Sequence, residues 1–206
     1  MNLVRYKTEE EQLAAVKKNA NIIKYIYNPS EAVQMAAVRQ KADTIVYIDN
    51  PSEAVQLEAI KHIPWIIQHI YNPSEKVQMA ALKHGSWVVI SYIHNPSKKV
   101  QEAAIKLSGN AIRFIHNPSE AVLLAAVKKS GLAIRYICNP SEKLQIAAVS
   151  RCPSAIKFIN NPTDEVVRYV IENNFKKPRI INSIRADFDK LPNDLQLLLK
   201  MNLSSK

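Results

Sequence analysis

Cations and aromatic rings stand side by side at a regular spacing in the C-terminal half of the chain. The pairs, 22 residues apart, are Arg113-Phe114, Arg135-Tyr136 and Lys157-Phe158. Such interleaving could neutralise phosphates and stack exposed bases, each stack being worth about 1–3 kcal/mol. The basic segment Lys176-Lys177-Pro178-Arg179 could add a phosphate or acidic-protein contact. The alternative, which we favour, is that the rings seal the seams between structural repeats while the cations remain hydrated.

Two tryptophans with neighbouring histidines form a second candidate site. Trp65 and Trp87 are 22 residues apart, His62 and His84 precede them by three residues, and Tyr92 follows. If successive repeats pack about 10 Å apart, the two indoles could form one aromatic patch. Tryptophan is enriched among the residues that dominate binding at protein interfaces, so this patch is the leading protein-binding site. The alternative is that the rings pack over the adjacent loop within the protein.

The sequence patterns of enzymes do not occur in the chain. We find no His-x-x-x-His or Cys-x-x-Cys pair, no glycine-rich phosphate loop and no nucleophile elbow. The histidines mostly recur as pairs at the repeat spacing, and the acidic residues concentrate at predicted helix starts, where capping accounts for them. We therefore expect a non-catalytic protein that needs no cofactor and no metal.

A glutamine recurs at one place in most repeats. Its carboxamide could line a polar binding groove or bond to the backbone of a neighbouring repeat, and the sequence leaves both interpretations open. The positions are Gln12, Gln34, Gln56, Gln78, Gln101 and Gln145.

These side chains recur because the chain contains an internal repeat. The motif Asn-Pro-Ser-Glu, or a close variant, begins at seven positions that are 22 residues apart, with one spacing of 23: Asn28, Asn50, Asn72, Asn95, Asn117, Asn139 and Asn161. A fixed period in this range is typical of arrays whose units bury their apolar sides by stacking. We predict a repeat array over residues 1–182, with about eight repeats starting near residues 6, 28, 50, 72, 95, 117, 139 and 161. A capping helix is expected within 183–206.

The motif predicts the start of a helix. In the repeat that begins at Asn117, this asparagine is the expected N-cap and Pro118 the first helical residue, where the missing N–H costs nothing. Glu120 lies three residues after Asn117, so its carboxylate could reach back to the cap N–H.

Each repeat is predicted to contain two helices. In the same repeat the first runs to Lys128 or Lys129 and a second, shorter helix covers 132–137. Val122, Ala125 and Ala126 are expected to share one buried face of the first helix. The second helix is too short to be stable alone and must be held by packing.

The composition favours a folded protein without a membrane span. Apolar residues make up 47% of the chain, and no apolar run approaches the roughly 20 residues that a span requires. The N-terminal residues do not form a secretory leader. The two cysteines, Cys138 and Cys152, suit a reducing compartment. We expect a cytoplasmic protein.

The net charge of +10 is unevenly distributed. Residues 1–94 contain 10 Lys/Arg and 9 Asp/Glu, whereas residues 95–206 contain 18 and 9. The excess indicates either an acidic partner for the C-terminal half or drift among exposed positions.

Stretches such as Asn50-Pro51-Ser52-Glu53-Ala54-Val55-Gln56-Leu57 resemble the leucine-rich repeat variant and short HEAT-like families. In those families an Asn/Asp-Pro-x-x-x-Val motif opens an α-helix, and a second short helix, sometimes 3₁₀, completes each unit. The resemblance covers roughly residues 6–182 and implies an all-α, right-handed superhelix used for binding. Near-identical arrays are also similar to those in phage and bacterial proteins of unassigned function. For a phage-encoded chain, inhibition of a host defence system would be expected.

Together these observations predict a non-catalytic solenoid that binds a partner protein. The alternative is a nucleic-acid-binding solenoid that uses the basic and aromatic residues of the C-terminal repeats.

Overall fold

The computed structural model describes residues 8–174, 184 and 191–204. In this part of the chain, seven α-helices are each followed by a six-residue 3₁₀ helix, and two further α-helices come after them. The α-helices are α1 (Glu9–Lys18), α2 (Glu31–Gln40), α3 (Glu53–His62), α4 (Glu75–His84), α5 (Lys98–Leu107), α6 (Glu120–Lys129), α7 (Glu142–Arg151), α8 (Asp164–Asn174) and α10 (Asn193–Ser204). The 3₁₀ helices are η1 (Ala20–Tyr25), η2 (Ala42–Tyr47), η3 (Pro64–His69), η4 (Trp87–Tyr92), η5 (Gly109–Phe114), η6 (Gly131–Tyr136) and η7 (Pro153–Phe158).

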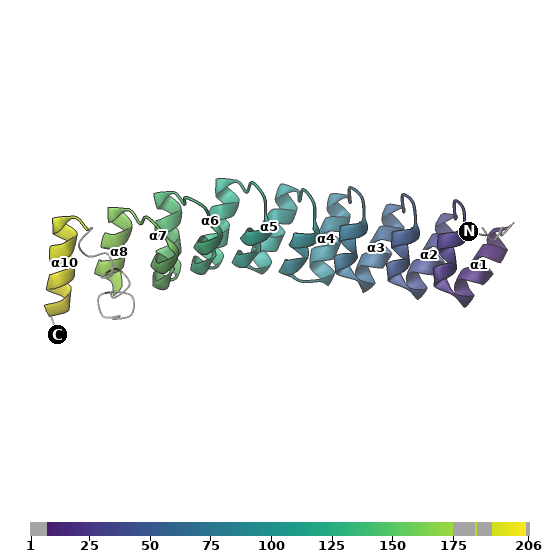
Figure 1. The fold of residues 1–206 in the computed structure, drawn as a ribbon, viewed down its shortest axis with the longest axis horizontal. Helices are drawn as coiled ribbons and strands as arrows, with labels where there is room; N and C mark the ends of the chain where they lie inside the picture. The colour runs from purple at the N-terminus through teal and green to yellow at the C-terminus, as the bar shows by residue number, and fades with distance from the viewer. Residues whose placement is uncertain (1–7, 175–183, 185–190, 205–206) are drawn as a thin grey trace. The chain divides into compact units, whose positions relative to one another are not determined.

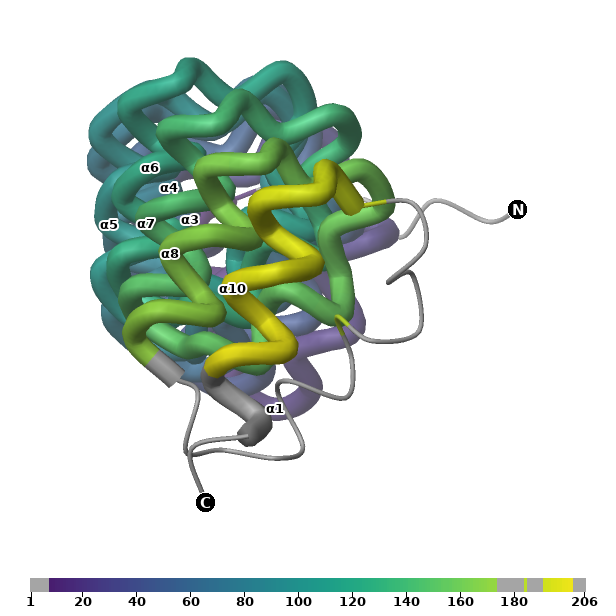
Figure 2. The backbone as a smooth tube through the Cα atoms, turned by 90° about the vertical axis from the view of Figure 1, so that its left-hand side faces the viewer, coloured from purple at the N-terminus to yellow at the C-terminus, as the bar shows by residue number. Residues whose placement is uncertain are grey.

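The chain divides into two compact units, an N-terminal unit of Met1–Ala103 and a C-terminal unit of Ala104–Lys206. In the N-terminal unit, α1 to α4 pack on one another in chain order, and the 3₁₀ helices form a second layer (Figure 1). In the C-terminal unit, α6, α7, α8 and α10 continue the same pattern, and α8 and α10 lie side by side (Figure 2). The all-α solenoid architecture predicted from the period is confirmed. Helix α10 lies within the segment predicted to contain a capping helix.

The core repeats with the sequence. The second alanine of each central pair is completely buried from Ala37 to Ala148, and a valine, isoleucine or leucine follows it at 3% exposure or less. In α6, Val122 and Ala126 are buried as predicted, but Ala125 is exposed. Ala125 was therefore wrongly assigned to the buried face: Val122 and Ala126 are i, i+4 neighbours on one helix side, and the buried Val127 extends this set past Ala126.

The predicted cap was wrong by two residues. Serine, not asparagine, is the N-cap: Ser119 accepts the N–H of Val122 at 3.4 Å, and α6 begins at Glu120. Asn117 instead adopts a left-handed conformation with φ 50°, so Pro118 precedes the cap. Glu120 therefore occupies the first helical position, where it complements the helix dipole but is not the third-residue partner of a capping box.

None of the described helices is both long and apolar enough to cross a membrane.

Candidate functional site

The predicted aromatic patch is a hollow on the N-terminal unit. Its volume is about 510 Å³, and its wall includes His62, Trp65, His84 and Tyr92. Trp65 follows Pro64 at the start of η3, and 54% of its surface is exposed. Four of the five residues predicted for protein binding are therefore brought together in one place.

Trp87 does not join them. It is half-buried and lies outside the lining of the hollow. The extra residue of the 23-residue repeat lies between α4 and η4, so Trp87 is the first residue of η4 while Trp65 is the second of η3. The structural counterpart of Trp65 is consequently Val88, which is exposed and lines the hollow. The prediction that both indoles occupy equivalent positions was wrong for this reason.

Gly85 lines the hollow at a place where no larger residue fits. A Cβ atom built at this residue would overlap the side chains of Val89 and Pro64. In the same lining, His62 Nε2 lies 3.5 Å from Glu58 Oε1, one helical turn earlier. The hollow is therefore lined by apolar and aromatic side chains together with two imidazole groups.

The predicted basic and aromatic pairs form a row in the C-terminal unit. The Arg113 guanidinium carbon lies 4.7 Å from the Phe114 ring centroid and 5.5 Å from that of Tyr136. The Arg135 guanidinium carbon lies 5.9 Å from the Tyr136 centroid and 4.3 Å from that of Phe158. These distances are within the range of cation–π contacts. Lys157 is exposed beside Phe158.

The rings of this row are only partly covered, since Tyr136 and Phe158 remain 37% and 41% exposed. Arg113 and Arg135 are exposed themselves, and each contacts a ring of the next repeat. The N-terminal unit has a shorter version, in which Lys24 Nζ lies 4.8 Å from the Tyr25 centroid. A hydrogen bond with the Tyr25 phenol is the main cause that raises the pKa of Lys24. Lys176, Lys177 and Arg179 lie outside the described residues.

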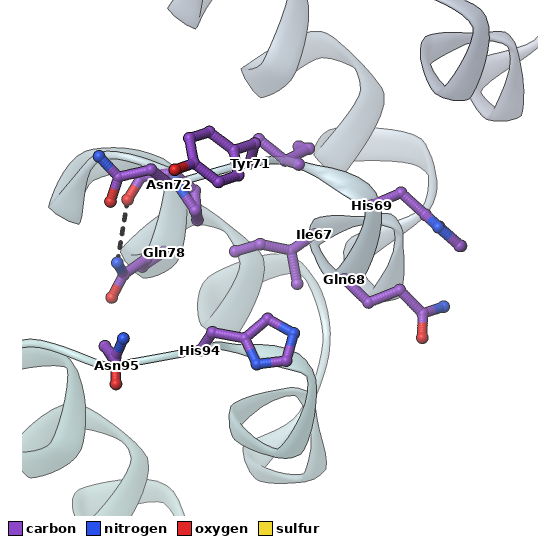
Figure 3. A pocket seen from close by; sticks show the side chains of 10 residues that line it. Ile67, Gln68, His69, Tyr71, Asn72, Gln78, His94 and Asn95 are labelled. Atoms are coloured by element: carbon purple, nitrogen blue, oxygen red, sulfur yellow. Dashed lines mark hydrogen bonds between the residues drawn. The ribbon is translucent and has the colours of Figure 1, made fainter.

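The structure adds two hollows beside the Asn-Pro loops, at equivalent places in the two units. The first, of about 520 Å³, is lined by residues that include Tyr71, Asn72, Gln78 and His94 (Figure 3). The second, of about 820 Å³, is lined by residues that include Arg135, Tyr136, Asn139, Lys157 and Asn161. The sequence contains a pattern that could have predicted these hollows. The residue before each Asn-Pro pair is tyrosine, aspartate, histidine, cysteine or asparagine and never aliphatic.

The recurrent glutamine supports these loops. Its Nε2 group donates to the carbonyl of the proline five residues earlier, as in Gln78 to Pro73 at 3.0 Å (Figure 3). The same bond is made by Gln34, Gln56, Gln101 and Gln145. Gln145 Oε1 also accepts the backbone N–H of Thr163 in the next repeat at 3.2 Å. The glutamine thus bonds to backbone chiefly within its own repeat, and at Gln145 it also links two repeats.

Within the described ranges, no group of three or more His, Cys, Asp or Glu side chains is placed to hold a metal ion. Comparisons with protein-family models, curated proteins and solved structures found no match. The fold itself therefore defines the class, an all-α solenoid, and the repeat-family resemblance remains an inference from the motif.

Proposed function

We propose that the protein is a non-catalytic binding module that captures a partner protein through the Trp65 hollow. The supporting observation is the exposure of Trp65 beside a hollow whose wall also includes the exposed side chains of Val88 and Tyr92. Burying apolar surface contributes roughly 25 cal/mol per Å². A partner that inserts an apolar or aromatic side chain into the hollow would therefore gain binding free energy.

The fold suits this role because it holds the site rigidly. Trp65 lies on a six-residue 3₁₀ helix whose neighbours Ile66 and Ile67 are buried at 5% and 1% exposure. The backbone of the site is thus anchored to the core, and binding orders few additional side chains. An indole has only two rotatable side-chain bonds, so it provides a large contact area at low entropic cost.

The proposed partner is a cytoplasmic protein, because the free cysteines Cys138 and Cys152 suit a reducing compartment. The positive charge of the C-terminal half would accelerate its encounter with an acidic surface. If the chain is phage-encoded, occupying the surface of a host defence protein would be sufficient for inhibition and would require no chemistry.

The test is capture of proteins from host lysate by the immobilised chain, with quantitative mass spectrometry of the bound material. Trp65→Ala should weaken capture of the stoichiometric partner about 30-fold, as expected of an interface hot spot. Leu197→Ala is the matched control, since it removes an apolar side chain that is 60% exposed on α10. Equal capture by both variants would reject the hollow as the binding site, and loss of all captured material on nuclease treatment would favour nucleic-acid binding.

A further inference from the structure

Guanidinium groups and aromatic rings alternate along the C-terminal unit, and this arrangement limits what the row can bind. Two arginines lie within 6 Å of the Tyr136 centroid, at 5.5 and 5.9 Å, and one of them also lies 4.3 Å from the Phe158 centroid. The rings on which a nucleic-acid base would stack are therefore already in contact with cations. The row is better suited to recognising negative charge than to stacking bases.

Arg135 is held in place by one hydrogen bond and keeps further N–H donors for a ligand. Arg135 Nε donates to the carbonyl of Leu132 at 3.1 Å, which fixes the side chain against its own 3₁₀ helix. The terminal nitrogens carry the remaining N–H groups, whose planar arrangement matches both oxygens of a carboxylate or phosphate. Among the described residues, no carboxylate forms an ion pair with Arg113 or Arg135.

The hollow beside Arg135 has the matching electrostatic character. Its lining contains two cations, Arg135 and Lys157, and three asparagine side chains, but no aspartate or glutamate. The volume of about 820 Å³ is large enough for several residues of an extended chain. Charge complementarity therefore calls for an anionic occupant that follows the row from repeat to repeat.

The spacing of the cations indicates the form of this occupant. Arg113 and Arg135 contact the same ring from successive repeats, and packed helices lie about 8–10 Å apart. A polyproline II segment has three residues per turn and rises 3.1 Å per residue, so every third side chain returns to the same side after about 9 Å. An acidic residue at every third position would thus place one carboxylate opposite each cation of the row.

We propose that Arg113, Arg135 and Lys157 bind an extended acidic segment of a protein, with one carboxylate for each repeat. This site is additional to the Trp65 hollow and lies in the other unit. It does not depend on the proposed function, because either surface can bind without the other.

The proposal is tested with the full chain and fluorescein-labelled peptides, by fluorescence anisotropy. One peptide repeats Glu-Pro-Pro, a second has the same composition with its glutamates in one block, and a third repeats Gln-Pro-Pro. The period-three acidic peptide should bind at least about tenfold more tightly than either of the others, because charge-assisted bonds form at every repeat. Its affinity should fall as salt concentration rises.

The double variant Arg113→Gln with Arg135→Gln should lose about tenfold or more in affinity for the period-three peptide. Lys61→Gln with Lys83→Gln is the matched control, because it removes the same net charge from exposed positions of the N-terminal unit. The control and Trp65→Ala should both retain binding. Circular dichroism verifies that each variant keeps its helical content.

Three results would overturn the proposal. Equal affinity for the periodic and the block peptide would mean that only net charge is recognised. Equal losses of peptide affinity in the arginine variant and its control would mean that binding depends on the overall charge of the protein and not on the row. Tighter binding of labelled oligothymidylate than of the acidic peptide, lost in the arginine variant alone, would assign the row to nucleic acid.

Discussion

The asparagine of the Asn-Pro-Ser-Glu motif has a conformational role. From Asn28 to Asn139, six successive motif asparagines have φ between 44° and 52°. This left-handed conformation is costly for most residues, but asparagine tolerates it because its short polar side chain can bond locally. Asparagine and serine are both favoured N-caps, so the motif alone did not reveal which of them caps the helix. The backbone conformation decides between them.

Substitutions of Asn50, which has φ 50°, test this role. Asn50→Ala should lower the free energy of unfolding by about 1–2 kcal/mol, because a Cβ-bearing residue without a local polar group is strained there. Asn50→Gly should change it by less than about 1 kcal/mol, since glycine adopts positive φ freely. Urea unfolding followed by circular dichroism measures both, with Asp49→Ala as the exposed neighbouring control. Equal effects of alanine and glycine would contradict a backbone role.

At the scale of helices, the cap serine also links one repeat to the previous one. In the N-terminal unit, the hydroxyl of Ser74 accepts the N–H of Val77 and donates to Glu53 Oε2 at 2.6 Å. Ser97 makes the corresponding bond to Glu75 at 2.6 Å. The sequence suggests that this glutamate would serve its own cap. A glutamate at the first helical position is instead within reach of the serine that begins the next helix.

These contacts predict an acid-sensitive component of stability. Bonds from Lys76 and then Ser74 lower the pKa of Glu53, and bonds from Ser97 and then Lys99 lower that of Glu75. A carboxylate with a lower pKa in the folded state stabilises the fold above its unfolded pKa, about 4.3 for glutamate. This contribution is lost as the pH falls through the lower folded value.

Glu53→Gln with Glu75→Gln should therefore flatten the dependence of the unfolding midpoint on pH below about pH 5. Thermal unfolding between pH 3 and pH 7 measures this dependence. Glu120→Gln is the control, because it replaces the glutamate at the same helix position in the C-terminal unit. An unchanged pH profile in the double variant would mean that the two carboxylates do not stabilise the fold.

The close approach of successive repeats gives a second prediction at this scale. A Cβ atom at Gly131 would lie 2.5 Å from the Ala148 carbonyl oxygen and 2.8 Å from Cys152 Cβ. Gly131→Ala should therefore destabilise the C-terminal unit by about 1–3 kcal/mol, the usual cost of overpacking. Chemical unfolding measures the change, and Lys129→Ala at an exposed neighbouring position is the control. An unaltered midpoint would show that the backbone relaxes at no cost.

For the whole molecule, the repeat period was sufficient to predict the solenoid class and the two-helix repeat, but the helix bounds only to within one or two residues. In the repeat that begins at Asn117, the first helix ends at Lys129 as predicted, and the second covers Gly131–Tyr136 instead of 132–137. Side-chain direction was harder to predict, because one extra residue before η4 rotates Trp87 out of the position of Trp65. The ring contacts of Arg113 and Arg135 depend on rotamers and were not predicted either.

The two compact units were not foreseen, since the motif continues through their boundary. The nearest irregularities in the sequence are the single 23-residue spacing before Asn95 and the lysine at 98, where most motifs have an acidic residue. Each of the two units contains one candidate binding surface. The N-terminal unit contains the Trp65 hollow, whereas the C-terminal unit contains the arginine row.

Two cooperative units should also open independently. In a repeat array each repeat is stabilised mainly by its neighbours, and the internal contacts of this chain gather within Met1–Ala103 and Ala104–Lys206. Ile60 and Ile134 are buried at 0% and 1% exposure, one in each unit. Replacing either with alanine leaves a cavity that costs about 2–5 kcal/mol. Ile60→Ala should therefore speed amide hydrogen exchange in α2–α4 and leave α6 and α7 unchanged, while Ile134→Ala should do the reverse. Hydrogen-exchange mass spectrometry distinguishes this outcome from a uniform loss of protection, which would mean that the whole chain unfolds as one cooperative unit.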